Sequence, residues 1–218
     1  MPKIHTSRTK IIDAPIDVVF KAVANMDEWA AWSPWLILEP GVQVDNAADG
    51  KSYSWDGNRV GAGHMVITER VENTSARYDL TFLKPFKSSA KVGMDVRKVA
   101  GGTEVVWSMD SSLPLFMFFM KNAMETYIGM DYERGLLLLA DYVTDGKVQS
   151  KLNFLDETDH AGCDYVGITR TSSIADMPAL MQGDFQTLMP WAAQNGLNPE
   201  DGFAIYHEFN PVKGTCHF

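Results

Sequence analysis

The chain has 218 residues, of which 45% are hydrophobic and 22% are charged, and its formal net charge is −9. This composition is typical of a folded globular protein and argues against a disordered chain. Proteins that bind phosphate groups concentrate Lys and Arg, and the sequence has no such cluster. We therefore expect neither nucleic acid nor a membrane as a partner.

Cysteine content and apolar runs indicate a cytoplasmic protein. The two cysteines, Cys163 and Cys216, are far apart and too few for a disulfide framework. The N-terminal residues lack the apolar core of a signal peptide. The most apolar run, residues 113–120, is much shorter than the roughly 20 residues that a transmembrane helix needs. We expect reduced thiols and a cytoplasmic location.

The first predicted helix covers about residues 14–29 and leads into a tryptophan-rich segment. Trp29 and Trp32 are three residues apart and therefore neighbours on a helical turn, whereas Pro34 directs Trp35 onto an extended segment. Two interpretations stay open. The tryptophans form a rigid plug that docks the helix on a sheet, or Trp32 and Trp35 line the entrance of a cavity.

Between residues 53 and 110 the sequence alternates apolar and polar side chains, which predicts antiparallel strands with one wetted face. Asp56-Gly57-Asn58 and Gly101-Gly102 are typical of turns between such strands. The apolar face is either a solid core or the wall of a ligand cavity. Its candidate ligand-binding residues are Trp55, Met65, Phe82, Met94, Trp107 and Met109.

A long helix is predicted over about residues 116–143. Side chains at steps of three and four form a stripe that should face the sheet: Met120, Met124, Tyr127, Asp131, Gly135, Leu138 and Tyr142. The stripe contains Asp131, a candidate general acid or ligand anchor; the alternative is a structural ion pair, for example with Arg134. The helix residues expected to contact a ligand are Phe116, Met120, Met124 and Tyr127.

Periodicity stops near residue 146 and returns near Cys163. We therefore expect a first domain over residues 1–145, a linker over 146–162 and a small βαββ module over 163–218. Asp176 suits the N-cap of the module's helix, and Pro190 should kink it.

The motifs of the first domain are WAAWSPW, YSWDGNRVGAG, FLKPFKSSA, GGTEVVWSM and MDYERGLLLL, in that order. Over residues 3–145 they resemble the polyketide cyclase/START-like superfamily, often called SRPBCC. The resemblance implies an α+β helix-grip fold (START/Bet v 1-like). In this fold a seven-stranded antiparallel sheet wraps around a long C-terminal helix and encloses an apolar cavity for lipids or polyketides.

The last region resembles half of another family. It is similar to the first half of a gyrase-inhibitor-like (GyrI-like) effector-binding domain. The segments that carry this resemblance are GITRTSSIADMPALMQGDFQTLMPWAAQNGL and AIYHEF. Such domains pair two modules around a ligand groove, and this sequence supplies one. Two explanations stay open: the chain is truncated, or a second copy completes the sheet as a homodimer through this module, since an open strand edge invites pairing.

Three functional hypotheses follow. The first is a protein that binds a hydrophobic small molecule, as a sensor or carrier, with no cofactor. The second is an enzyme of the cyclase or dehydratase type, with Asp131, Tyr127 or Asp110 transferring protons. The third is a regulatory protein that assembles through the C-terminal module. The histidines lack metal-ligand spacing, so we expect no metal. The one weak alternative is a zinc site formed by His207, His217 and Cys216.

Overall fold

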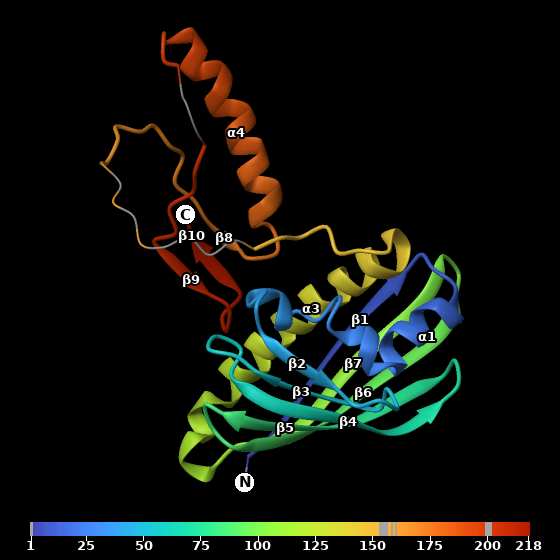
Figure 1. Ribbon diagram of the computed structural model, residues 1–218. Coiled ribbons are helices and arrows are strands. Elements are labelled where there is room, and N and C mark those ends of the chain that lie inside the picture. The colour runs from blue at the N-terminus through green and yellow to red at the C-terminus, as the bar shows by residue number, and fades with distance from the viewer. Residues whose placement is uncertain (1, 153–156, 158, 160, 199–201) are drawn as a thin grey trace. The chain divides into compact units, whose positions relative to one another are not determined.

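The chain divides into two units, Met1–Phe154 (unit 1) and Leu155–Phe218 (unit 2). The computed structural model describes residues 2–152, 157, 159, 161–198 and 202–218 (Figure 1). The division between the units falls inside the predicted linker.

Unit 1 is built on a seven-stranded antiparallel sheet in the order β1–β7–β6–β5–β4–β3–β2. The predicted alternation is clear in β7, where every second residue from Thr103 to Met109 is buried. β1 and β7 pair along their whole length, from Lys3 opposite Ser112 to Ile12 opposite Thr103. The strands are β1 (Lys3–Ile12), β2 (Gln43–Asn46), β3 (Ser52–Asp56), β4 (Ala62–Val71), β5 (Ser75–Lys84), β6 (Ser88–Val99) and β7 (Gly102–Ser112).

A long helix, α3 (Lys121–Asp145), crosses one face of this sheet (Figure 1). The core lies between the sheet, α3, α1 (Ile16–Ala24) and α2 (Met26–Trp29), and a short 3-10 helix, η1 (Leu36–Leu38), follows α2. This arrangement confirms the predicted helix-grip fold.

The start of the long helix differs from the prediction. Residues Leu115–Met120 form a 3-10 helix, η2, after Pro114, and the α-helix begins at Lys121 rather than near 116. A 3-10 helix has three residues per turn, so the faces of η2 do not continue those of α3.

The two predicted turns behave differently. Gly101-Gly102 joins β6 to β7, and Gly102 has φ of 126°, with the Ile12 carbonyl oxygen so close that no Cβ would fit. The Asp56-Gly57-Asn58 segment instead opens a longer loop, because β4 begins only at Ala62. Glu39 holds this loop by accepting backbone hydrogen bonds from residues 58–60 at 2.9–3.2 Å.

Unit 2 has the predicted βαββ order: β8 (Thr171–Ser173), α4 (Met177–Gln194), β9 (Glu208–Asn210) and β10 (Thr215–His217). The strands pair in the order β8–β10–β9 and are shorter than the sequence pattern predicts. Pro190 lies inside α4, which continues for four more residues.

Candidate ligand-binding sites

Five aromatic rings from four parts of unit 1 form one cluster in its core. Trp29 and Trp32 have ring centroids 4.5 Å apart, and each lies within 5.7 Å of Trp107 on β7. Trp107 in turn stacks on Tyr132 of α3 at 4.1 Å, and Trp35 packs against the edges of both. The tryptophan-rich segment is therefore joined to the sheet and to α3 through ring contacts, as the plug interpretation proposed.

Hydrogen bonds fix this cluster on α1. The Trp32 indole N–H donates to the Ala22 carbonyl at 3.2 Å, and the Tyr78 hydroxyl donates to the Val23 carbonyl at 2.6 Å. Because both carbonyls lie near the end of α1, these bonds determine where the helix meets the sheet. Trp32 is 1% exposed, so it lies inside the core and not at an entrance.

A glycine lets α3 approach the cluster. A Cβ on Gly135 would lie 2.5 Å from a ring carbon of Trp107 and 3.0 Å from Cγ of Pro34. Neither neighbour is the free end of a flexible chain, since one is a packed ring and the other a proline. The predicted stripe included Gly135, and its role is to keep α3 close to the tryptophans.

The apolar interior contains two buried indole N–H groups, those of Trp29 and Trp107. Among the described residues, the buried indole N–H groups of Trp29 and Trp107 have no hydrogen-bond acceptor. Each lies beside a buried phenol, that of Tyr53 and that of Tyr132 respectively, and the nearby indole N–H acts to lower the pKa of the phenol. The geometry of each pair nevertheless falls short of a hydrogen bond. Burial is the larger influence and raises the pKa of both phenols, so both hydroxyls are neutral.

Most of the predicted lining residues of the sheet are in the core. Trp55, Met65, Met94 and Met109 are buried, and Phe82 is half-buried. The Trp55 N–H donates to the Val60 carbonyl at 3.3 Å. These residues do share the face that meets α3, which the alternation predicted.

The predicted helix residues divide into two groups. Met120 and Met124 are half-buried, and Met124 packs against the core. Phe116 is 75% exposed and Tyr127 is 53% exposed, so neither lines the interior, contrary to the prediction. Phe116 belongs to η2, whose residues include none that are buried, and in α3 the buried aromatic residue is Tyr132, which the predicted stripe missed.

The candidate catalytic residues have separate environments. Asp131 accepts hydrogen bonds from the Trp35 indole at 3.2 Å and from Arg134 at 3.1 Å, and Arg134 also donates to the Pro34 carbonyl at 2.8 Å. This is the ion pair that the sequence offered as the alternative to catalysis. Partial burial raises the pKa of Asp131, while Arg134 and then Trp35 oppose the rise.

The other two candidates are more exposed than Asp131. Asp110 is largely exposed at the end of β7, where its carboxylate is 2.8 Å from Nδ1 of His5. Tyr127 points to solvent one turn before Asp131. Among the described residues, no hydrogen bond or ion pair joins any two of these three groups.

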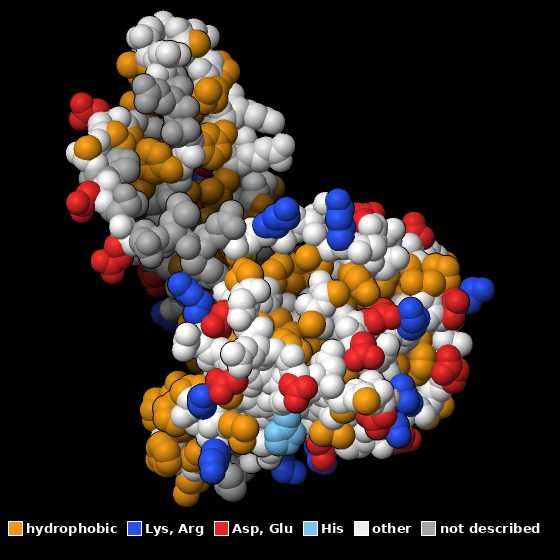
Figure 2. Space-filling model, in the orientation of Figure 1, with side chains coloured by type: hydrophobic (Ala, Val, Ile, Leu, Met, Phe, Trp, Pro, Cys, Tyr) orange, Lys and Arg blue, Asp and Glu red, His pale blue; other side chains and the backbone are white. Residues whose placement is uncertain are grey.

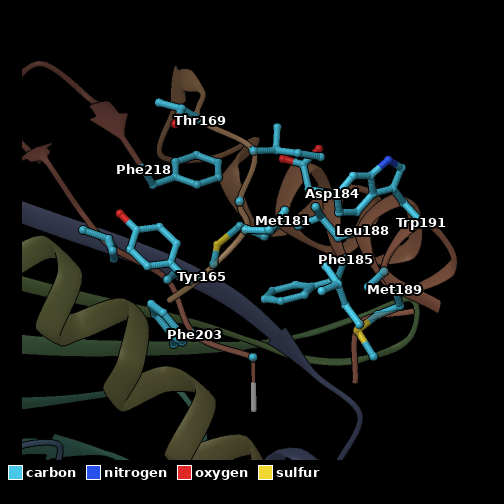
Figure 3. A pocket seen from close by; sticks show the side chains of 18 of the residues that line it. Tyr165, Thr169, Met181, Asp184, Phe185, Leu188, Met189, Trp191, Phe203 and Phe218 are labelled. Carbon is cyan, nitrogen blue, oxygen red and sulfur yellow. The ribbon is translucent and has the colours of Figure 1, made fainter. Parts of the chain in front are cut away.

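A pocket of about 680 Å³ lies in unit 2 (Figure 3). Its walls come from α4 and from the irregular segments on either side of it, and Tyr165 meets Phe203 edge to face at 5.6 Å. Sequence reasoning missed this pocket, because the expected ligand groove lay between two modules. The aromatic lining residues are Tyr165, Phe185, Trp191, Phe203 and Phe218.

One buried charge forms part of the wall of this pocket. Asp184 on α4 is 7% exposed and accepts three hydrogen bonds from Arg170, at 2.6–2.8 Å. The guanidinium lowers the pKa of Asp184, so the pair is ionised with no net charge. The pocket therefore offers aromatic surface beside a neutralised ion pair.

His207 and His217, two of the residues considered for zinc, have ring centroids 4.9 Å apart. Among the described residues, no group of three His, Cys, Asp or Glu side chains is placed to hold a metal ion. None of the described helices combines the length and hydropathy needed to cross a membrane.

Comparison with known proteins connects this geometry to a family. A family model described as polyketide cyclase/dehydrase and lipid transport matches residues 3–144. The fold is similar to the di-domain ARO/CYC protein StfQ of the steffimycin biosynthetic pathway, with a TM-score of 0.53 and 8% identity over 66% of this chain and 51% of that one.

Two further solved structures are similar over unit 1. Ara h 8.0201 has a TM-score of 0.49 and 14% identity over 66% of this chain and 99% of that one. CV1439 of Chromobacterium violaceum has a TM-score of 0.48 and 16% identity over 64% and 96%. No curated protein matches the chain. Since the family model covers most of the sequence, the chain belongs to the polyketide cyclase/dehydrase and lipid transport family.

Proposed function

We propose that unit 1 binds an apolar small molecule that carries a hydroxyl or carbonyl oxygen, between the sheet and α3. The observation that carries this proposal is a pair of indole N–H groups, of Trp29 and Trp107, that are buried in an apolar interior and have no acceptor among the described residues. Burying an unpaired donor costs about 1–3 kcal/mol, and a ligand oxygen would remove that cost. Apolar lining with a few placed polar groups is typical of small-molecule sites.

The ligand would reach this interior beside the N-terminal half of α3. Buried residues of α3 begin at Gly129, whereas Met124 and Ile128 are only half-buried against the core. Fewer packed side chains lower the cost of moving this half of the helix away from the sheet. The C-terminal half, with Tyr132 stacked on Trp107, would stay in place.

Binding, rather than catalysis, is the function that the side chains support. Asp131 has the raised pKa that a general acid needs, but Trp35 and Arg134 already occupy its carboxylate oxygens. The Asp131→Asn variant separates the two functions. Ligand binding should be kept in either case, whereas a loss of turnover is expected only if the protein is an enzyme that uses Asp131.

The test compares two ligands that differ by one oxygen. In equilibrium dialysis, 2-naphthol should bind wild-type protein more tightly than naphthalene does. Trp107→Phe keeps an aromatic ring and removes the N–H, so it should weaken 2-naphthol binding about tenfold and change naphthalene binding less than twofold. Equal affinity for both ligands in wild type, or an unchanged preference in the variant, would contradict the proposal.

Unit 2 is a second candidate site, and its pocket is the observation that favours it. A volume of about 680 Å³ lies in the range that holds small ligands. Because Arg170 neutralises Asp184, a neutral aromatic molecule suits the walls better than a cation does. Phe185→Ala removes one aromatic side chain from the pocket lining. It should abolish the binding of a neutral aromatic ligand to unit 2 and leave 2-naphthol binding to unit 1 unchanged.

A further inference from the structure

One end of unit 1 exposes large apolar side chains that the core does not use. Leu83 and Phe86, at the hairpin between β5 and β6, are 47% and 80% exposed. The remaining members belong to η2, whose residues include none that are buried. We call the set the apolar tip; it consists of Leu83, Phe86, Leu115, Phe116, Phe118 and Phe119.

The two segments of the tip are neighbours in space. β6 lies between β5 and β7, and Phe82 pairs with Ser88 just before the hairpin turns. On the next strand, the Ser111 hydroxyl donates to the Ser89 carbonyl at 2.8 Å, and η2 starts four residues later. Figure 2 shows hydrophobic side chains gathered at the lower left, at this end of unit 1, with blue Lys or Arg side chains beside them.

The charge of the tip is opposite to that of the whole chain. Residues 83–88 and 112–121 contain Lys84, Lys87 and Lys121 but no Asp or Glu, in a sequence with net charge −9. Lys3 adds a fourth ammonium group, since it lies opposite Ser112 at the start of β1.

Two of these lysines contact carboxylates from outside the tip. Lys84 meets Asp56 at 2.9 Å, and Lys121 meets Glu125 at 2.6 Å. The Lys84–Asp56 pair is well exposed, and such pairs contribute little energy, so a phosphate group can compete for the ammonium. The tip therefore keeps a basic rim around its aromatic centre.

We propose that the apolar tip docks on an anionic phospholipid surface. Its Phe and Leu side chains enter the interfacial layer, and the lysine ammonium groups contact lipid phosphates, as in other peripheral membrane proteins. The local positive charge selects this occupant over a second copy of the chain, because tip-to-tip contact would bring the lysines of two copies together.

This proposal does not depend on ligand binding in the interior. The net charge of −9 argues against attraction of the whole molecule to an anionic membrane, but it does not argue against contact through a tip that is locally positive. Anchoring would be peripheral, through one end of a folded domain.

The test is co-sedimentation with vesicles of phosphatidylcholine alone or with 30 mol% phosphatidylglycerol. Wild-type protein should bind the anionic vesicles and lose most binding at high salt. Phe118→Ser/Phe119→Ser should weaken this binding at least tenfold, and Lys87→Glu about fivefold or more. The substituted side chains are exposed, so the melting temperature should stay unchanged.

A matched control replaces two exposed apolar residues elsewhere. Leu137→Ser/Phe209→Ser removes side chains that are 54% and 43% exposed, outside the tip, and should leave vesicle binding within twofold of wild type. The proposal is overturned if wild type does not sediment with anionic vesicles, or if this control loses as much binding as the tip variant. It is also overturned if the tip variant changes only the oligomeric mass, because the tip would then be a contact between copies.

Discussion

Two carboxylates of unit 1 show how environment decides the behaviour of a residue. Asp131 is partly buried beside an indole and a guanidinium, and burial raises its pKa. Glu39 accepts backbone hydrogen bonds from Asn58 and Arg59, which lower its pKa. The sequence offered an Asp131–Arg134 ion pair as one alternative to a catalytic role. It could not predict the role of Glu39, because the loop that Glu39 holds is about 20 residues away in the chain.

These opposite shifts predict opposite dependences of stability on pH. Asp131 binds a proton more readily when folded, so its contribution to stability falls as pH rises above its ordinary value of 3.8. Glu39 binds a proton less readily when folded, so its contribution is present above 4.5 and is lost as pH falls below that value.

Urea unfolding from pH 3 to pH 7 checks both signs, with each variant as the control for the other. Relative to wild type, Asp131→Asn should become more stable as pH rises through the region just above 3.8. Glu39→Gln should become less stable as pH rises toward 4.5. A parallel pH profile of wild type and either variant would mean that the carboxylate concerned does not change its pKa on folding.

At the scale of elements, α3 shows what periodicity can and cannot predict. The existence of a long helix that faces the sheet was predictable, and so was Gly135 on its inner face. The exact start was not, because the 3-10 geometry of η2 depends on packing and on the position of Pro114. Within α3 the stripe placed Gly135 correctly, but it included Tyr127, which is exposed, and missed Tyr132, which is buried.

The close approach of α3 to the aromatic cluster predicts opposite effects for one substitution at two places. Gly135→Ala should destabilise unit 1 by about 1–3 kcal/mol, because a Cβ would overlap Trp107 and Pro34. Gly183→Ala in α4 meets no atom within 4 Å, and replacing a mid-helix glycine should stabilise that helix by up to about 1 kcal/mol. Thermal unfolding followed by circular dichroism measures both, and equal effects at the two sites would refute the overlap argument.

At the scale of the whole molecule, the two units differ in how much side chain they bury. The sheet and grip were predictable because alternation, helical stripes and ordered motifs all indicated the same fold. Unit 2 was predicted only as an element order. Its strands are short because, among its described residues, only Asp184, Ala192, Cys216 and Phe218 are buried, which is little support for a sheet.

This difference predicts unequal protection from hydrogen exchange. Amides of α3 from Tyr132 to Leu139 lie over a packed core, and those of α4 do not, so α4 should exchange at least tenfold faster in dilute protein. Mass spectrometry of exchanged peptides measures both helices in one sample. Slow exchange of α4 at every protein concentration would contradict the prediction. If the protection of α4 increases with protein concentration, a second copy covers its exposed apolar side chains, which include Met189 and Trp191. That result would support a homodimer through this module.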